Sequence, residues 1–255
     1  MARAIDLNVD VGEGLGVWTV GNDLPFLAIA TSVNIACGFH AGDPQIMDKT
    51  VAAAMDAGVA IGAHPGFRDL HGFGRREMTT DPAEVEAEVL YQVGALAAFA
   101  RAHGSHLTHV KPHGALYNQA ARDPVLARAL ASAVRRAGEE LVLVGLASSL
   151  AMRRAAEAEG LRFAAEAFAD RAYEADGSLR SRRAPGAVLS DPETAARQAV
   201  RLARDGRVAS WEGSEISLSA DTLCVHGDNP DGLAIARAVR LALEAEGITV
   251  SAFSR

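Results

Sequence analysis

The stretch Asn34-Ile35-Ala36-Cys37-Gly38-Phe39-His40-Ala41-Gly42-Asp43 joins a β-type apolar run, which reaches it from Thr31, to a helical segment that begins at Pro44. Two glycines, a histidine, a thiol and a carboxylate lie between the two elements, a mixture that packing alone rarely selects. The stretch therefore predicts the end of a β-strand that opens into a polar cavity and is followed by a helix.

The same strand-to-helix pattern recurs along the chain and predicts parallel strands joined by crossover helices. The predicted strands span residues 4–10, 31–36, 59–63, 107–111, 141–146, 161–166 and 222–226. The predicted helices span residues 44–57, 82–103, 124–137, 149–159, 192–205 and 231–246. These β/α units with short connections favour a closed or nearly closed seven-stranded TIM-like β/α-barrel, although periodicity alone leaves a doubly wound sheet open.

The ends of the predicted helices carry matching signals. Four helices begin with Asp-Pro, at Asp43, Asp81, Asp123 and Asp191, which is typical of an N-cap followed by proline in the first turn. Glycines follow the helices and predict left-handed C-caps at Gly58, Gly104, Gly138, Gly160 and Gly247. Residues 206–220 form a less regular segment in which we expect a small hairpin. No linker or change of composition divides residues 1–255, so we expect a single barrel domain.

Composition limits the classes of partner. The chain has 255 residues, of which 49% are hydrophobic, and a formal net charge of −7. The acidic balance without a Lys/Arg-rich run disfavours nucleic acid and anionic membranes as partners. The apolar runs are far shorter than the roughly 18 residues of a membrane-spanning helix, and Met1–Arg3 lead directly into a strand, so we expect a cytoplasmic protein. Cys37 and Cys224 lie in different motifs and are expected to be reduced, buried thiols.

Polar residues gather where the predicted strands end, which is where barrel enzymes carry their catalytic groups. Period two places Asp6, Asn8 and Asp10 on one face of the first strand, shortly before Glu13. Buried carboxylates cost several kcal/mol unless they are paired, so this face predicts either an internal hydrogen-bond network or a site. In the second unit we expect Asn34 to face inward and His40 and Asp43 to lie at the mouth, with Asp43 alternatively acting only as an N-cap.

Histidines mark the ends of the third and fourth predicted strands. His64 follows the third strand and is a candidate acid–base or ligand residue. His109, Lys111 and His113 share one face of an extended segment, and Pro112 argues against a helical metal-binding pair. Lys111 is a candidate for binding phosphate or a substrate carboxylate, with an ion pair inside the barrel as the alternative.

The loops after the strands add charged residues that suit anion binding. Arg75 and Arg76 follow the third strand, Glu166 ends the sixth strand, and Asp170 and Arg171 follow it. His226 and Asp228 precede the last helix, whose N-terminus offers free N–H groups. The P-loop, the dinucleotide fingerprint and the G-x-S-x-G elbow are all missing from the sequence, so a nucleotide would need a site of another kind.

Six motifs taken together resemble the LamB/YcsF family, and the resemblance extends over residues 5–246. They occupy residues 6–13, 34–44, 62–76, 110–118, 166–173 and 224–230. The resemblance implies a seven-stranded barrel similar to the glycoside hydrolase/deacetylase superfamily. It also implies ATP-dependent cleavage of the cyclic amide 5-oxoproline to L-glutamate, together with B and C subunits. The first motif of the family usually has a cysteine at the position of Val9, which faces away from Asn8 and Asp10.

This interpretation assigns two groups of site residues. The catalytic candidates are Asp10, Glu13, His40, His64, Lys111 and His113. The candidates for binding substrate or nucleotide are Asn8, Asn34, Asp43, Arg75, Arg76, Glu166, Asp170, Arg171, His226 and Asp228. ATP is expected as co-substrate, and no residue is assigned to a metal. Two alternatives remain at this point: a metal-dependent amidohydrolase or deacetylase that uses Asp10, His64 and either His113 or His226, and a non-catalytic scaffold subunit.

Overall fold

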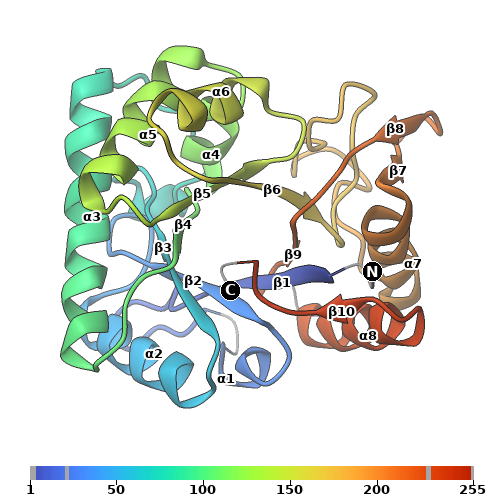
Figure 1. Ribbon diagram of the computed structural model, residues 1–255, viewed down its shortest axis with the longest axis horizontal. Coiled ribbons are helices and arrows are strands. Elements are labelled where there is room, and N and C mark those ends of the chain that lie inside the picture. Colours follow the sequence, from blue (N-terminus) through green and yellow to red (C-terminus); the bar gives the residue numbers. More distant parts are fainter. Residues whose placement is uncertain (1–3, 21–22, 228–230, 254–255) are drawn as a thin grey trace.

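The computed structural model describes residues 4–20, 23–227 and 231–253. Seven parallel strands pair in the order β1-β2-β3-β4-β5-β6-β9, and pairing of β1 with β9 closes the ring (Figure 1). The strands of the barrel are β1 Ala4–Val11, β2 Ser32–Ala36, β3 Ala60–His64, β4 His109–Val110, β5 Val142–Leu146, β6 Phe163–Phe168 and β9 Thr222–Val225. The predicted seven-stranded barrel is confirmed.

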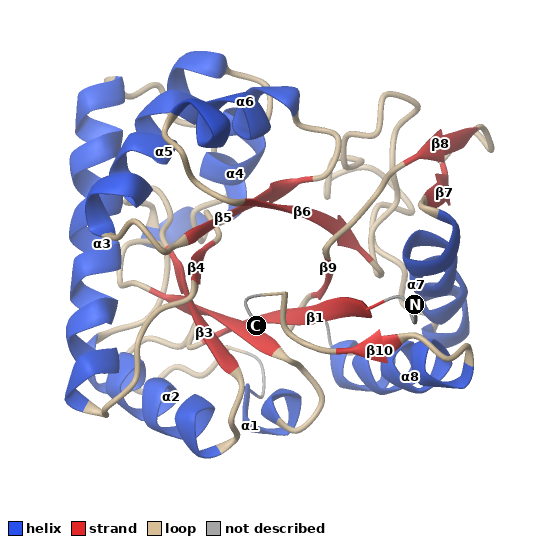
Figure 2. Ribbon diagram, viewed as in Figure 1, coloured by secondary structure: helices blue, strands red, loops and turns tan. Residues whose placement is uncertain are grey.

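Helices surround the ring of strands on its outside (Figure 2). They are α1 Asp23–Leu27, α2 Pro44–Asp56, α3 Pro82–Ala102, α4 Gly114–Ala120, α5 Pro124–Ala137, α6 Leu150–Ala158, α7 Pro192–Asp205 and α8 Gly232–Ala245, with a 3-10 turn at Leu70–Gly72. The six predicted helices all form, with ends shifted by no more than one residue. The sequence did not predict α1 and α4, because segments of five and seven residues are too short for helical periodicity to reveal.

The helix starts follow the predicted capping chemistry. Each of the four Asp-Pro aspartates accepts a hydrogen bond from at least one backbone N–H in the first turn of its helix. Four of the five predicted C-cap glycines have positive φ: Gly58, Gly104, Gly160 and Gly247. The prediction for Gly138 is wrong, because its φ of 175° is extended backbone and the chain leaves α5 without a left-handed residue.

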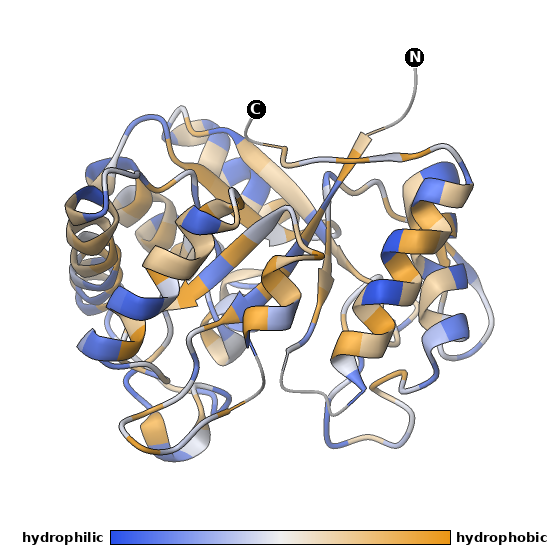
Figure 3. Ribbon diagram, turned by 90° about the horizontal axis from the view of Figure 1, so that it is seen from below, coloured by the Kyte–Doolittle hydropathy of each residue, from blue (hydrophilic) through white to orange (hydrophobic). Residues whose placement is uncertain are grey.

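The apolar core lies between the barrel and the helices. On β1, Leu7, Val9 and Val11 are fully buried and belong to the same core as Val51 of α2 and Val239 of α8. The alternate residues of β1 point into the barrel, so Val9 faces away from the polar interior as predicted. Figure 3 shows that the outer helices carry hydrophilic and hydrophobic residues on one ribbon, as amphipathic helices over a barrel do.

Two small strand pairs complete the fold. The expected hairpin is present as β7 Arg207–Ala209 and β8 Glu215–Ser217, which pair antiparallel. The short strand β10 Thr249–Val250 pairs with the first residues of β1 and brings the C-terminal segment under the barrel. Among the described residues, no helix is both long and apolar enough to cross a lipid bilayer.

Candidate active site

The lower polar layer of the barrel is built around Asp6. Its carboxylate accepts hydrogen bonds from the hydroxyls of Thr31, Ser32 and Thr222. The side chain is fully buried, and this burial raises the pKa of Asp6 to about 6 despite the three hydroxyls. These hydrogen bonds connect β1 to β2 and β9. Asp6, one of the three polar residues on the inner face of β1, therefore has a structural role.

Asn34 and His109 form the next layer toward the mouth. Asn34 Nδ2 donates to Asn8 Oδ1 and to Asp10 Oδ1, each at 2.8 Å. His109 Nε2 lies 2.9 Å from Asn34 Oδ1 and donates to it. Burial lowers the pKa of His109 to about 3, so its imidazole is neutral. A Cβ at Gly62 would lie 2.1 Å from His109 Nε2, so only glycine at this position of β3 leaves room for the ring.

Lys111 is the cation at the centre of the site. Its Nζ lies 2.9 Å from Asp10 Oδ1, 2.8 Å from Glu166 Oε1 and 3.1 Å from Cys224 Sγ. Burial alone would lower the pKa of Lys111, but the two carboxylates outweigh it and hold that pKa well above its usual value. The predicted ion pair inside the barrel is therefore present, and the ammonium faces the cavity.

His64 and His113 form a pair whose outer nitrogens are fixed by carbonyl groups. His64 Nδ1 donates to the backbone oxygen of Lys111 at 2.7 Å, and His113 Nε2 donates to that of Phe73 at 2.9 Å. The remaining nitrogens, His64 Nε2 and His113 Nδ1, face each other at 2.9 Å. Asp10 Oδ2 lies 3.3 Å from His64 Nε2, so the pair is also next to a carboxylate.

Phe73 owes its role to an unusual backbone conformation. With a φ of 53°, it is the one non-glycine residue with positive φ in the described part of the chain. Its carbonyl is the acceptor that orients His113, so a strained residue supports the site. Sequence reasoning missed Phe73, because nothing in its side chain signals a left-handed backbone.

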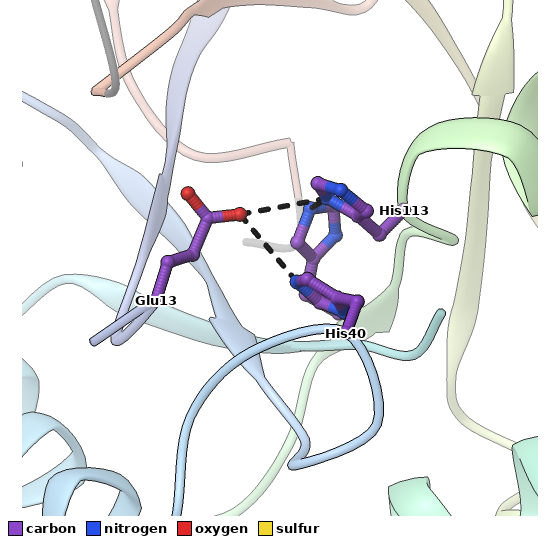
Figure 4. A group of neighbouring side chains, drawn as sticks. Glu13, His40 and His113 are labelled. Atoms are coloured by element: carbon purple, nitrogen blue, oxygen red, sulfur yellow. Dashed lines mark hydrogen bonds and ion pairs between the residues drawn. The ribbon is translucent and has the colours of Figure 1, made fainter. Parts of the chain in front are cut away.

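Glu13 and His40 complete this cluster (Figure 4). Glu13 Oε1 lies 3.5 Å from His40 Nε2 and 3.5 Å from His113 Nδ1. The rings of His40 and His113 stack in parallel with their centroids 3.8 Å apart. Burial lowers the pKa values of both rings well below the usual value, so each is neutral. Three imidazoles and a carboxylate thus converge beside the cavity.

His226 and Asp170 form a second acid–base pair close to Asp10 and Cys224, both of which contact Lys111 Nζ. His226 Nδ1 lies 2.9 Å from Asp170 Oδ1, and the backbone N–H of His226 donates to the same carboxylate. Burial lowers the pKa of His226, which keeps the ring neutral with Nδ1 as the donor. Phe168 stacks on the ring at 5.3 Å. The Nε2 atom therefore has a free lone pair and can accept a proton.

A cavity of about 760 Å³ lies beside these groups, at the C-terminal ends of the strands. Nine predicted site residues line it: Asp10, Glu13, His64, Arg75, Arg76, Lys111, His113, Arg171 and His226. Arg122, Arg180, Arg182 and Arg183 also line the cavity, and they make its outer part strongly basic although the chain as a whole is acidic.

The structure places the other predicted site residues away from the cavity surface. Asn8, Asn34, Glu166 and Asp170 are at most 1% exposed and bind neighbouring side chains, so they position Lys111, Asp10 and His226. His40 is 1% exposed and lies behind His113, not at the open mouth.

The assignment of Asp43 to substrate or nucleotide binding is wrong. Its carboxylate accepts hydrogen bonds from the backbone N–H groups of Gly16, Gln45 and Ile46, so it caps α2 and anchors a loop outside the cavity. Asp228 lies outside the described residues.

Three further residues of the site did not emerge from the sequence. Cys224 was expected to be a simple buried thiol, yet it contacts Lys111 Nζ. Tyr117 and Phe168 line the cavity, and burial together with the charge of Glu166 raises the pKa of Tyr117 well above its usual value. Both aromatic residues follow strand ends, so their position was a usable signal, but an apolar ring there is equally typical of packing.

Known proteins are similar to this chain over nearly its full length. The A subunit of 5-oxoprolinase from Rhodopseudomonas palustris (strain ATCC BAA-98 / CGA009) is 57% identical over 251 residues, which cover 98% of each chain. The A subunit of 5-oxoprolinase from Heliobacterium modesticaldum is 56% identical over 248 residues and 97% of each chain.

Solved structures extend the comparison. A lactam utilization protein from Thermus thermophilus is 49% identical, with a TM-score of 0.92 over 98% of this chain and 100% of that one. A T48 deacetylase at 16% identity, with a TM-score of 0.51 over 98% of this chain and 87% of that one, shares the fold alone. The LamB/YcsF family model matches residues 5–255, and the chain belongs to the LamB/YcsF family.

Proposed function

We propose that this chain is the A subunit of a 5-oxoprolinase and that it works in the cytoplasm with B and C subunits. In this proposal residues 1–255 act as one barrel domain, which takes part in the ATP-dependent hydrolysis of 5-oxoproline to L-glutamate. The observation that carries the proposal is the identity of more than half of all residues, over nearly the full length, with proteins named as the A subunit of 5-oxoprolinase.

The chemistry of a cyclic amide explains why ATP would be needed. A lactam is a poor electrophile, because its nitrogen donates electron density to the carbonyl carbon. Transfer of the γ-phosphoryl group to the lactam oxygen releases ADP and makes the ring carbon a better target for water. Water adds to that carbon, and cleavage of the C–N bond opens the ring to an acyl phosphate. A second water hydrolyses the acyl phosphate, which releases inorganic phosphate and leaves L-glutamate. A site for this reaction must hold phosphate charge, remove a proton from water and protonate the leaving nitrogen.

Lys111 and His226 suit two of these tasks. The ammonium of Lys111 is buried between Asp10 and Glu166, where it can stabilise negative charge that develops on an oxygen in the cavity. The neutral ring of His226 is oriented by Asp170, and its Nε2 can accept a proton from water. The same imidazole, which then holds the proton taken from water, can protonate the leaving ring nitrogen.

The outer part of the cavity supports the nucleotide assignment. Arginine binds phosphate through a planar, permanently charged fork, and several arginines line this part of the cavity. Arg171 is held by the backbone oxygens of Ala187 and Arg180, so its guanidinium is already ordered. We infer that the triphosphate binds among these arginines and that the lactam binds deeper, next to Lys111.

The decisive experiment measures glutamate released from 5-oxoproline. The chain is assayed alone and mixed with its B and C subunits, with and without ATP. We expect glutamate only in the mixture that contains ATP and all subunits. Absence of glutamate from every mixture would refute the proposal.

A second experiment separates a catalytic role from a scaffolding role. His226→Ala and Asp10→Ala are compared with the wild-type chain in the reconstituted complex, after size-exclusion chromatography has shown that each variant assembles. Loss of a general base or of a charged site residue typically lowers turnover by about 10²- to 10⁴-fold. Full turnover by an assembled Asp10→Ala complex would mean that the chain only positions its partners.

A further inference from the structure

We propose that Glu13, His40, His64 and His113 bind one divalent transition-metal ion of the zinc type. Their candidate ligand atoms lie within 4.8 Å of one another, and all four residues are buried. Imidazole and carboxylate are the donors that zinc prefers when it is not bound by thiolates. The inference does not depend on the substrate proposed above, because it concerns binding of the ion to the chain alone.

The hydrogen bonds of His64 and His113 leave the two inner nitrogens with lone pairs. A carbonyl oxygen can only accept, so His64 Nδ1 and His113 Nε2 both carry hydrogen. The second nitrogen of each ring, His64 Nε2 and His113 Nδ1, then faces the other at 2.9 Å, and two lone pairs at this distance need a proton or a metal ion beside them. A cation must lie near them, and carbonyl oxygens that hold the far nitrogens are the usual support of histidine metal ligands.

His40 distinguishes a metal ion from a shared proton. Its side chain is buried, and neither of its ring nitrogens has a hydrogen-bond partner among the described residues. A proton shared by His64 and His113 would leave both nitrogens of His40 unsatisfied, which is costly for a buried polar group. A divalent ion gives the Nε2 atom a partner, since this atom points toward Glu13 (Figure 4).

The spacing of the donor atoms fits a metal ion. Ligand atoms about 2.0–2.2 Å from zinc are about 3.0 Å apart at a right angle and about 3.5 Å apart at a tetrahedral angle. The observed separations are 2.9 Å between His64 and His113 and 3.5 Å from Glu13 to each of His40 and His113. The His40 ring lies parallel to that of His113, so it must turn for its lone pair to reach the ion.

The cavity lets a metal ion reach the cluster, whereas a positive charge makes a neighbouring set of donor atoms a poor metal site. Glu13, His64 and His113 line the cavity, so an ion can enter and a water or substrate oxygen can bind beside it. Asp10, Cys224 and His226 also lie close together, but the ammonium of Lys111 contacts Asp10 and Cys224 and would repel a second cation there. The cluster around His40 is therefore the better site.

The test measures zinc binding to the full chain without substrate. The chain is stripped with EDTA and titrated with Zn²⁺ in competition with a chromophoric chelator, and bound metal is counted by plasma mass spectrometry. We expect one zinc per chain. His40→Ala removes a ring that makes no hydrogen bond to the described part of the chain, and Glu13→Gln keeps the size of the side chain. Each should weaken zinc binding by about 100-fold or more, given that even residues behind metal ligands are worth 10- to 100-fold.

His106→Ala is the matched control, because it removes an exposed imidazole outside the cluster. It should bind zinc as the wild-type chain does. Urea unfolding in EDTA checks that all variants fold, and the visible spectrum of the Co²⁺ form reports nitrogen and oxygen coordination independently of activity. Substoichiometric zinc in the wild-type chain, or equal affinity in His40→Ala and His106→Ala, would overturn the proposal. Either result leaves the glutamate assay unaffected, so the two proposals fail separately.

Discussion

Lys111 shows how one residue organises the polar interior. It neutralises two carboxylates, Asp10 from β1 and Glu166 from β6, two strands that only β9 separates in the ring. Removing one partner of a buried ion pair leaves an uncompensated charge, which costs more than the pair itself contributes. The residue therefore affects stability and chemistry together, and the two effects need separate experiments.

Replacing Lys111 by Met should lower the free energy of unfolding by about 3–5 kcal/mol, because Asp10 and Glu166 are left without their cation. The double variant Lys111→Met/Glu166→Gln should recover part of this loss, because only one buried charge remains, but it should not recover glutamate release. Urea unfolding and the reconstituted assay provide the two measurements. Recovery of turnover in the double variant would show that Lys111 has no role beyond charge balance.

Asp6 makes a pH-dependent contribution whose sign follows from its raised pKa. Between pH 3.8 and about 6 the folded chain holds a proton that the unfolded chain releases, so this contribution to stability is present at low pH and is lost as pH rises through 6. The difference corresponds to about 3 kcal/mol. Asp6→Asn should therefore gain about this much stability relative to the wild type between pH 3.5 and pH 7.5. Parallel urea curves at both pH values test it, and a constant difference would contradict the pKa.

At the scale of elements, the end of β3 illustrates why small residues lie beside large polar ones. Gly62 faces His109 of β4, and Gly66 faces His40, where an added Cβ would lie 2.7 Å from Nδ1. The sequence pattern predicted β3, but it did not explain why these two positions are glycine. Neighbouring elements fill the space that a side chain would need, so only glycine fits there.

Gly62→Ala should destabilise the fold by about 1–3 kcal/mol, because the new methyl group overlaps the His109 ring and the ring has no free space inside the barrel. Gly94→Ala is the matched control. This glycine lies on the exposed face of α3 with nothing within 4 Å of an added Cβ, so alanine should stabilise the helix by about 0.5–1 kcal/mol. Thermal or urea unfolding measures both, and equal effects of the two substitutions would contradict the packing argument.

At the scale of the whole molecule, the C-terminal segment closes the lower end of the barrel. The Phe253 side chain packs on a small apolar cluster of Val142, Val144 and Ala164. Its ring centroid is 5.4 Å from that of His109. The cluster is separate from the main core because these residues face into the barrel, whereas Leu143 faces the helices. The C-terminal segment thus closes the lower end of the barrel, whose wall includes the N-terminal strand β1.

Phe253→Ala should lower the free energy of unfolding by about 1–3 kcal/mol, because the half-buried ring is lost and water reaches the apolar cluster. Leu241→Ala is a suitable comparison, since Leu241 is 67% exposed and should change stability little. Glutamate release by the reconstituted complex should stay close to that of the wild type, because the cavity lies at the other end of the barrel. A Phe253→Ala chain with wild-type stability would show that the segment does not seal the barrel.

The sequence by itself determined the architecture, because local rules carry that information. Period-two strands, alanine-rich helices and the Asp-Pro caps predicted the seven strands and six long helices, and the motifs at the strand ends predicted where polar groups meet. Tertiary structure decided which of those groups face one another. Asp43 became a cap, Asn34 and Glu166 became supports for Asp10 and Lys111, and Cys224 joined the site. Spacing along a strand fixes the face on which a side chain lies, but closure of the barrel fixes its partner across the interior.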